Sequence, residues 1–330
     1  MKTKIFLLRI VALFALTGVR AQDPAKKHVN IGLVYPISTN GLEAKSRTNS
    51  LSLNAVGGLS YAETGACVAG IGSVVLDSAR GAMVAGFGNV VVGSARGVMV
   101  SGFGNLVMGS SKGLQVAGFE NVNKHAADVQ VAGFLNKAAD VHTQVAGFMN
   151  IARKVRGVQI AGFMNIADSS DYPVALINIV RNGEMSVAVS TDETLTTLAS
   201  FHSGGRKLYG IVGFGYNHKG VRSLAAWEAG FGAHVVTTSR FRLNLEVVNI
   251  GLTDFKAGDW MKSSFRVLPV YRVSHRIELF AGPSFNYLHA RKGQGEGIVD
   301  HFLWSDSNTH NYYGLFFGAT GGVTISLTNK

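Results

Sequence analysis

Cysteine is almost missing from this chain, since Cys67 is the only one among 330 residues. An intramolecular disulfide is therefore impossible, and a metal–thiolate cluster would have no second sulfur. We expect Cys67 to be a small, buried apolar side chain in the first coil of the repeat described below.

Runs of charge and long apolar stretches are also lacking. No five consecutive residues are Lys or Arg, which argues against a nucleic-acid-binding arm. Beyond residue 21 no stretch approaches 18 apolar residues without a charge, so no spanning helix is predicted there. Helix-period patterning is almost absent after residue 22 and proline is rare. Alternating apolar and polar residues dominate instead, and they predict an all-β protein.

The first 21 residues have the order of an export signal. Lys2 and Lys4 form a basic start, residues 5–16 an apolar core broken only by Arg9, and residues 19–21 (Val-Arg-Ala) a small-x-small cleavage site. We therefore predict that residues 1–21 are a signal peptide and that the mature chain is exported to the cell envelope.

A motif of the form Val-Ala-Gly-Phe-x-Asn occurs six times between Val84 and Asn165. Its Gly-Phe steps fall 16, 16, 15, 14 and 15 residues apart, and weaker copies flank the run at residues 68–71 and 174–178. A short, nearly fixed period is typical of a stacked array. The repetition also argues against an enzyme, because a catalytic site needs one distinct set of residues.

Two packings are compatible with the repeat: each copy is one coil of a β-solenoid or one strand of an antiparallel barrel. In a barrel the natural repeat would be two strands, whereas here it is one unit of 14–16 residues. The copy between Gly133 and Gly147 also leaves only about seven residues of strand, while a membrane-spanning strand needs about 9–11. Both points favour the solenoid. If the barrel is correct instead, the whole chain forms one wide pore.

Parallel stacking of the coils would bring the recurring Phe and Asn residues into ladders. Stacked Asn amides can hydrogen-bond along the axis while the aromatic rings pack face to face. In the clearest copy, alternation places Val158, Ile160, Gly162, Met164 and Ile166 on one side and Gln159, Ala161, Phe163 and Asn165 on the other. The predicted ladder residues are Phe87, Phe103, Phe119, Phe134, Phe148, Phe163, Asn89, Asn105, Asn121, Asn136, Asn150 and Asn165.

The pattern of predicted strands changes near residues 182–183: the strands before this point are short and repetitive, and those after it are longer and dissimilar. We predict an N-terminal cap at residues 22–61, a repeat β-solenoid at 62–182, and an approximately eight-stranded antiparallel β-barrel of the outer-membrane type at 183–330. The cap and the barrel would cover the two ends of the coil stack, which are otherwise unpaired sheet edges.

Long strands with clean alternation predict the barrel. The expected strands are 185–191, 194–202, 206–217, 223–236, 239–252, 262–273, 275–289 and 311–327. Aromatic residues on their apolar faces suggest interfacial girdles, namely Tyr209, Tyr216, Phe241, Tyr271, Tyr287 and Tyr313. The opposite faces hold charges of both signs that would fill a small barrel. The predicted interior network is Glu228, Arg240, Arg242, Glu246, Arg266, Arg272 and Glu278.

The loop at residues 291–311 is the one segment that suggests binding, because it is long and contains Asp300, His301, Trp304, Asp306 and His310. The spacing matches no established metal site. We predict no catalytic, cofactor-binding or metal-binding residues. The acid pairs at 168 and 171 and at 192 and 193 are interpreted as turn residues.

Residues 157–167 (Gly-Val-Gln-Ile-Ala-Gly-Phe-Met-Asn-Ile-Ala), together with residues 177–183 and 34–41, resemble the surface-repeat proteins of Gram-negative bacteria, whose pattern is G-[VL]-Q-[IV]-A-G-F-x-N. Residues 278–287 are similar to a strand of outer-membrane β-barrels. The resemblance covers most of the mature chain. It implies an exported, envelope-associated protein and supplies no catalytic residues.

The expected function is thus non-enzymatic: the barrel anchors the chain in the outer membrane and the solenoid is a scaffold or binding surface. An even-stranded barrel would place the solenoid in the periplasm, whereas the resemblance implies the cell surface, and both placements stay open. The expected partners are outer-membrane lipid and, as a second candidate, another envelope or surface protein. No nucleic acid or cofactor is expected. The alternatives are the single pore and an envelope enzyme or metal-binding protein that uses the 291–311 loop.

Overall fold

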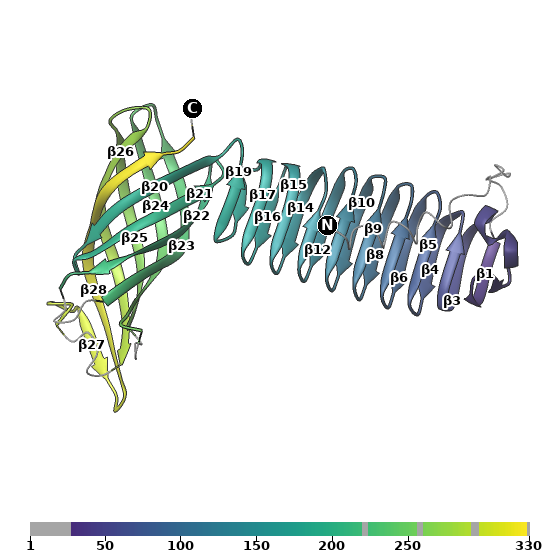
Figure 1. The fold of residues 1–330 in the computed structure, drawn as a ribbon, viewed down its shortest axis with the longest axis horizontal. Helices are drawn as coiled ribbons and strands as arrows, with labels where there is room; N and C mark the ends of the chain where they lie inside the picture. Colours follow the sequence, from purple (N-terminus) through teal and green to yellow (C-terminus); the bar gives the residue numbers. More distant parts are fainter. Residues whose placement is uncertain (1–27, 220–223, 256–259, 292–296, 329–330) are drawn as a thin grey trace. The chain divides into compact units, whose positions relative to one another are not determined.

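The computed structural model describes residues 28–219, 224–255, 260–291 and 297–328. They form a parallel β-solenoid of about nine turns and a closed, eight-stranded antiparallel β-barrel (Figure 1), which confirms the predicted fold class. The predicted signal peptide lies outside the described residues, as do residues 22–27 of the predicted cap. No helix in the described part of the chain is long and apolar enough to cross a membrane.

The chain divides into two compact units, Met1–His125 and Ala126–Lys330. The boundary falls within the repeat because a solenoid coil contacts only its neighbours and the stack has no single core. The described part of the first unit contains the 3₁₀ helix η1 (Gly41–Ser46) and eleven strands. These are β1 (His28–Val34), β2 (Ile37–Ser38), β3 (Thr48–Ser60), β4 (Ala62–Ala69), β5 (Gly72–Val75), β6 (Ala79–Ala85), β7 (Gly88–Val91), β8 (Ala95–Ser101), β9 (Gly104–Val107), β10 (Ser111–Ala117) and β11 (Glu120–Asn123).

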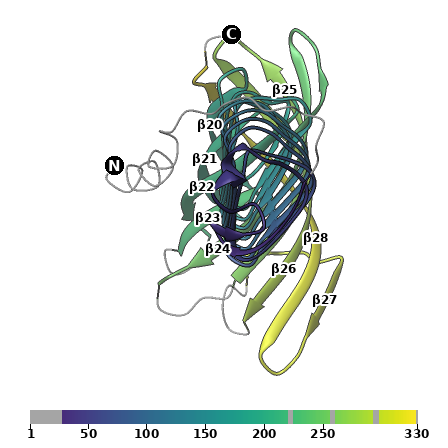
Figure 2. The same cartoon turned by 90° about the vertical axis from the view of Figure 1, so that its right-hand side faces the viewer.

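Strands of successive coils pair in parallel and in register, so equivalent repeat residues lie side by side. Met83 of β6 pairs with Met99 of β8, and Asn89 of β7 pairs with Asn105 of β9. Viewed end-on, the coils of the first unit superimpose as one flattened loop (Figure 2). The motif glycine permits this spacing, because a Cβ at Gly102 would lie 2.1 Å from the carbonyl oxygen of Gly86 in the preceding coil.

The edge of β1 at the first coil is covered by a turn rather than left open. The Thr39 hydroxyl accepts a hydrogen bond from the Ile31 amide (3.0 Å) and donates to the carbonyl of Val29 (3.2 Å), and the Thr39 amide donates to the carbonyl of Ile31 (2.9 Å). Blocking an edge in this way hinders pairing with another chain. The described part of residues 22–61 therefore covers the end of the stack, as a cap does.

The second unit begins with the remaining coils. Their strands are β12 (Ala127–Ala132), β13 (Leu135–Lys137), β14 (Asp140–Ala146), β15 (Met149–Val155), β16 (Val158–Ala161), β17 (Met164–Ser169), β18 (Tyr172–Val174) and β19 (Ile177–Val180). The chain bends between β16 and β17 at Gly162 and Phe163. This bend corrects the predicted alternation, because Gln159 and Asn165 are buried while Phe163 is exposed.

The barrel consists of β20 (Glu184–Asp192), β21 (Thr196–Gly204), β22 (Leu208–Asn217), β23 (Leu224–Thr237), β24 (Phe241–Thr253), β25 (Trp260–Arg272), β26 (Ile277–Arg291) and β28 (Asn311–Ser326), with the short β27 (Trp304–Ser307) paired to β28. Each neighbouring pair is antiparallel, and pairing of β20 with β28 closes the barrel. Since the repeats form parallel coils instead of barrel strands, the alternative of one pore made from the whole chain is wrong.

Alternation along the barrel strands places apolar side chains outside and polar ones inside. Phe214 and Phe317 are 70% and 69% exposed, whereas Glu228 and Arg266 are 2% and 3% exposed. Most of the predicted aromatic girdle lies outside, but Tyr209 does not. It is buried and its hydroxyl donates to Glu246 Oε1 (2.7 Å) inside the barrel.

Candidate functional site

An asparagine column runs through the interior of the first unit. Asn89 Nδ2 donates to Asn105 Oδ1 (3.0 Å), and Asn105 Nδ2 donates to Asn121 Oδ1 (2.9 Å). The hydroxyl of Ser73 donates to Asn89 Oδ1 (2.8 Å) and extends the column by one coil. All three asparagines are at most 1% exposed, so the predicted Asn residues of this unit lie together and away from solvent.

The second unit contains the same column. The amides donate in the order Asn136 to Asn150, Asn150 to Asn165 and Asn165 to Asn178, over 2.9–3.0 Å. Each of these Nδ2 groups also donates to a main-chain carbonyl; for Asn150 the acceptor is Ile160. Both amide hydrogens are thereby satisfied in a buried site, as a low-dielectric interior requires.

The predicted phenylalanines lie on the outside of the coils, at the corner that follows the motif glycine. The stacked pairs are Phe87–Phe103, Phe103–Phe119, Phe134–Phe148 and Phe148–Phe163, with ring centroids 4.8–5.1 Å apart. Their exposure ranges from 37% to 57%. The Phe residues thus form a ladder on the outside of the coils, and the Asn residues form a ladder inside them.

A second interior column changes character between the two units. In the first unit Cys67, Met83, Met99 and Gln115 occupy equivalent positions. Cys67 is 2% exposed, which confirms its predicted role as a small buried side chain; burial, with a smaller contribution from the charge of Glu63, raises the pKa of its thiol to about 12. Sulfur-containing side chains thus fill this part of the core.

In the second unit the equivalent positions hold glutamines. Gln144 Nε2 donates to Gln130 Oε1 (2.8 Å), and Gln159 Nε2 donates to Gln144 Oε1 (2.9 Å). The column stops where Gln159 pairs with Pro173, and Gln159 Oε1 has no hydrogen-bond partner among the described residues. This interior column is therefore polar and internally bonded over the later coils, beside an apolar cluster that includes Val141 and Val155.

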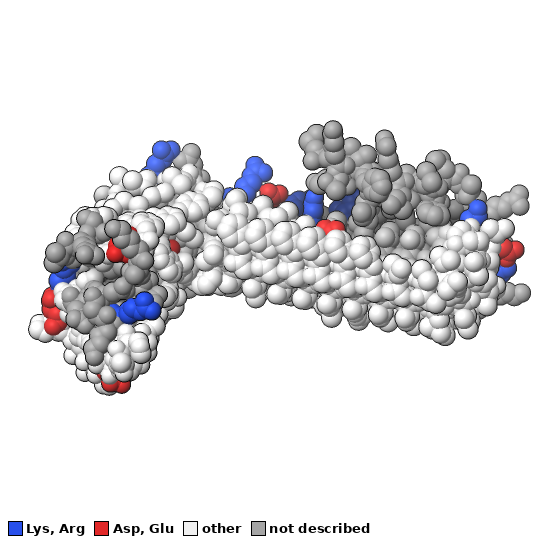
Figure 3. Space-filling view, turned by 60° about the horizontal axis from the view of Figure 1, so that its bottom comes forward, with Lys and Arg blue, Asp and Glu red and all other residues white. Residues whose placement is uncertain are grey.

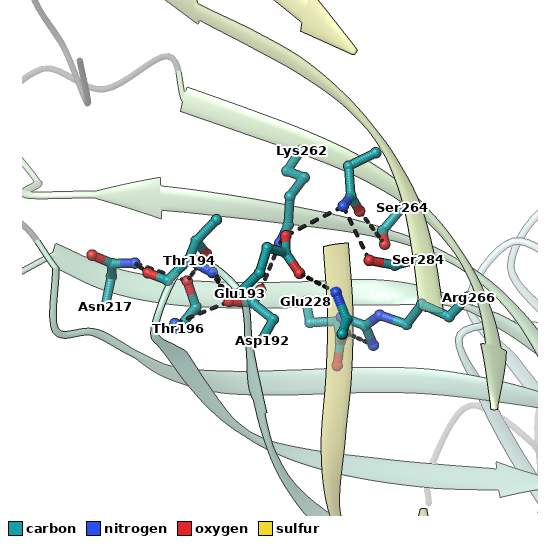
Figure 4. A network of polar contacts seen from close by, with 12 residues as sticks. Asp192, Glu193, Thr194, Thr196, Asn217, Glu228, Lys262, Ser264, Arg266 and Ser284 are labelled. Carbon is teal, nitrogen blue, oxygen red and sulfur yellow. Dashed lines mark hydrogen bonds and ion pairs between the residues drawn. The ribbon is translucent and has the colours of Figure 1, made fainter. Parts of the chain in front are cut away.

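The barrel interior holds a network of buried ions (Figure 4). Lys262 Nζ lies 2.6 Å from Asp192 Oδ2 and 2.9 Å from Glu193 Oε1, and its side chain is 1% exposed. Asp192 also accepts hydrogen bonds from the amide and hydroxyl of Thr194 and from the amide of Thr196. Asp192 ends β20, and its carbonyl accepts a hydrogen bond from the Leu195 amide in the turn that follows. The predicted turn acid therefore also forms a buried ion pair inside the barrel.

A second pair lies further along the barrel interior. Arg266 Nη1 lies 2.7 Å from Glu228 Oε1 and 3.6 Å from Glu246 Oε2. The hydroxyl of Ser200 donates to the other Glu228 oxygen over 2.5 Å. All three charged side chains are almost fully buried, and their mutual pairing offsets part of the desolvation of each.

Nearer the end of the barrel where β20 begins, Glu184 Oε2 lies 3.1 Å from His234 Nε2 and 2.7 Å from Arg242 Nη1. Arg242 also pairs with Glu278 (2.6 Å), which in turn contacts Arg272 Nε (3.1 Å). A cavity of about 20 Å³ adjoins this cluster, which is room for about one water molecule. The cavity is too small for an organic substrate.

The opposite end of the barrel is closed by apolar side chains. Ile298, from the segment before β27, is 3% exposed and belongs to a cluster with Ile250, Trp260 and Phe316; Phe302 packs against it. Apolar residues at one end and ion pairs in the middle fill the interior, and two cavities of about 20 and 50 Å³ adjoin Glu184 and Arg242 near the other end. The described interior is therefore a packed core and not an open channel.

Of the predicted interior network, Glu228, Arg242, Glu246, Arg266 and Glu278 lie together inside the barrel, and Arg272 is partly exposed at its end. Arg240 must be corrected: it lies in the turn before β24 and is exposed. The prediction missed Lys262. A signal was available, because Lys262, Ser264 and Arg266 alternate with the exposed Met261 and Phe265.

The 291–311 loop shows no ligand cluster in its described part. Asp300 pairs with Lys219 Nζ (2.5 Å), and His301 and His310 are exposed. Residues 292–296 lie outside the described residues. Among the described residues no group of three or more His, Cys, Asp or Glu side chains is arranged to hold a metal ion.

The last coil packs against the barrel wall. The Asn178 amide donates to the Ser203 hydroxyl (3.0 Å), and Asn178 Nδ2 donates to the carbonyl of Ser203 (3.2 Å). Outside this contact, Arg206 pairs with Asp171 (3.0 Å). A Cβ at Gly210 would lie 2.3 Å from the carbonyl oxygen of Ala175, so glycine is needed for the approach. The β21–β22 hairpin thereby covers the end of the stack.

Comparison of the chain with family models, with curated proteins and with solved structures finds no match.

Proposed function

We propose that this chain is a non-enzymatic protein of the cell envelope, in which the barrel is an outer-membrane anchor and the coils are a scaffold or binding surface. The observation that carries the proposal is the polarity of the barrel. Its outward positions are apolar, with Phe214 and Phe317 about 70% exposed, while Lys262 and Arg266 are buried inside. Water outside would favour the reverse arrangement, and lipid favours this one.

The barrel interior supports anchoring over transport. Ion pairs occupy the middle of the barrel and Ile298 and Phe302 close one end. An eight-stranded barrel is only wide enough for side chains to fill. We expect the purified chain to be nearly silent in planar-bilayer conductance measurements, and steady open-channel current would contradict the anchor role.

The anchor is tested by placing a charge on the outward wall. Phe214→Lys should oppose membrane insertion, because a Lys on the lipid face costs about 2–4 kcal/mol at the midplane. Ser239→Lys, in the exposed turn before β24, is the matched control. Membrane fractions washed with alkaline carbonate should retain the wild type and Ser239→Lys and lose Phe214→Lys. Release of the wild type by carbonate would overturn the proposal.

Protease treatment of intact cells tests which side the coils face. Cleavage within residues 62–182 without permeabilisation would place the coils at the surface, and cleavage only after permeabilisation would place them in the periplasm. The resemblance of the repeat to surface-repeat proteins favours the first outcome, and an even number of strands favours the second. Each outcome removes one of the two placements.

A further inference from the structure

The outer surface of the coils is apolar where a water-soluble solenoid would be polar. In β16, β17 and the bend between them, Val158, Ile160 and Phe163 are 36%, 41% and 38% exposed, and Met164 and Ile166 also point outward. The side chains that alternate with them are buried: Gln159, Ala161, Asn165 and Ala167. In these two strands small and polar groups thus face the core while branched and aromatic groups face out. A contiguous apolar surface of this kind marks an interaction site.

Most of the charge on the coils lies along one edge, with Glu120 and Lys137 as exceptions in the strands that follow the Phe corner. In the second unit Arg153, Lys154 and Arg156 are exposed at the end of β15 and in the turn that follows it. The Phe corner and the two strand faces beside it carry few charges. The space-filling view shows one such face as uncharged, with Lys, Arg, Asp and Glu along its edge (Figure 3). The coils therefore have an apolar surface on both strand faces and a polar edge opposite the Phe corner.

The first unit repeats this arrangement. Val84, Phe87 and Val98 face outward and are 41%, 57% and 42% exposed. At the edge, Arg80, Arg96 and Lys112 are exposed and pair in register as one basic column. Aligned cations next to an apolar surface are complementary to the phosphates and acyl chains of a lipid leaflet.

The apolar surface of the last coil is continuous with the apolar outer wall of the barrel. Tyr209 and Ile211 of β22 point into the barrel, so Gly210 between them faces outward. The carbonyl oxygens of Ala175 and Leu176 lie against Gly210. The last coil thus contacts the same side of the wall that carries Phe214, and the apolar surfaces of coil and barrel adjoin.

We propose that the coils lie in the interfacial region of a lipid leaflet, with acyl chains against the Val, Ile and Phe columns and the charged edge at the headgroups. This deepens the proposed function and rests on the barrel being a membrane anchor. The main-chain groups suit such a place, because the coils hydrogen-bond to one another and Thr39 covers the β1 edge. The coils lie in the leaflet without spanning it.

A second copy of the chain is the competing occupant. An isologous pair would cover one strand face, whereas here both strand faces and the Phe corner are apolar. Lipid covers all three at once, and a basic edge would repel the same edge of a copy beside it. The observations therefore favour lipid.

The test uses the full chain in vesicles of phosphatidylcholine and phosphatidylglycerol. Single cysteines are introduced into a Cys67→Ala background and labelled with an environment-sensitive fluorophore. Ile160→Cys reports the apolar face, Arg156→Cys the charged edge and Phe317→Cys the barrel wall. Iodide measures access from water, and lipids with brominated or spin-labelled chains measure contact with acyl groups. Val84→Cys in the first unit is a second reporter of the apolar face, should Ile160→Cys fail to fold.

We expect labels at 160 and 317 to be quenched by the chain-labelled lipids and to show several-fold lower iodide quenching than the label at 156. If 317 is protected while 160 and 156 are equally open to iodide, the anchor stands and the lipid contact is wrong. If 160 and 317 are both open to iodide, the membrane anchor itself fails. Protection of 160 from iodide without quenching by chain-labelled lipid, together with concentration-dependent cross-linking between chains, would replace lipid by a second copy.

Discussion

The amide of Asn150 donates to Oδ1 of Asn165 over 3.0 Å while its own Oδ1 accepts from Asn136. Asn150→Ala should destabilise the second-unit coils by about 3 kcal/mol, because Asn165 Oδ1 and the Ile160 carbonyl lose a donor and the buried Asn136 amide loses one of its two acceptors. Hydrogen exchange resolved to residues 140–170 in increasing urea measures this loss.

Phe148→Leu is the matched control in the same coil. It removes ring stacking with Phe134 and Phe163 at an exposed corner, which is worth about 0.5–1.5 kcal/mol. A loss of protection in Asn150→Ala no greater than in Phe148→Leu would show that the buried column does not hold the coils together.

Lys262→Met should lower the thermal stability of the barrel in detergent micelles by about 3–5 kcal/mol, because it leaves Asp192 as an uncompensated buried charge. Adding Asp192→Asn should restore part of the loss. Lys219→Met, which breaks the exposed pair with Asp300, should cost at most about 1 kcal/mol. Equal effects of the two Lys substitutions would contradict the assignment of Lys262 to the core.

Gly210→Val should loosen the last coil from the barrel, because the new side chain would meet the carbonyl oxygens of Ala175 and Leu176 at 2.3 Å and 2.5 Å from its Cβ. We expect faster proteolysis within residues 170–184 with the barrel intact. Phe214→Val, at an outward position of the same strand, is the control. Unchanged cleavage in Gly210→Val would mean that this contact does not order the junction.

Glu63 gives the first unit a pH dependence. Burial raises the pKa of its carboxyl above the ordinary value, although Ser52 donates to it over 2.7 Å. A raised pKa means that the folded chain prefers the protonated form, so this contribution to stability is complete below about pH 4.5 and is lost as the pH rises through the folded-state pKa.

Glu63→Gln should therefore raise the urea midpoint of the first unit at pH 8 and change it little at pH 4. The measurement is hydrogen exchange of residues 48–75 at the two pH values. A stabilisation that is equal at both would point to packing and not to titration.

Cys67 should not react with maleimide in the folded chain at pH 8. Its thiol is buried and its pKa is raised to about 12, so almost no thiolate is present and reagent has no access. Labelling should appear only with unfolding of the first unit in urea, at the same midpoint as loss of exchange protection. Prompt labelling in native buffer would contradict the described burial.

Much of the fold follows from the sequence because two patterns in it are regular, the 14–16-residue repeat and the alternation of apolar and polar residues. The 14–16-residue repeat predicts parallel coils, and alternation from residue 185 onward predicts the eight barrel strands within a few residues. Alternation does not say which face is the inside, however, and the bend at Gly162 moves Phe163 to the opposite side from Asn165. Arg240 alternates in step with Arg242, but it lies outside the strand, because β24 begins at Phe241, two residues after the predicted start at 239.

The sequence predicts most of the Arg and Glu residues of the barrel network, but not Lys262 and its pairing with Asp192. Lys262 lies 70 positions from Asp192 in the chain, and closure of the barrel through β20 and β28 brings such distant residues together. Tyr209 is a further example. Its position near a strand end predicts a girdle residue, and only the hydrogen bond to the distant Glu246 shows that it lies inside the barrel.

The two ends of the coil stack are unlike each other, while the coils between them are alike. Thr39 covers the first edge and the β21–β22 hairpin the last, and neither cover depends on how many coils separate them. Duplicating or deleting one 14–16-residue unit among coils that share the same interior column would present the same faces to both neighbours. The number of coils is therefore an adjustable quantity in evolution and in design, independent of the anchor.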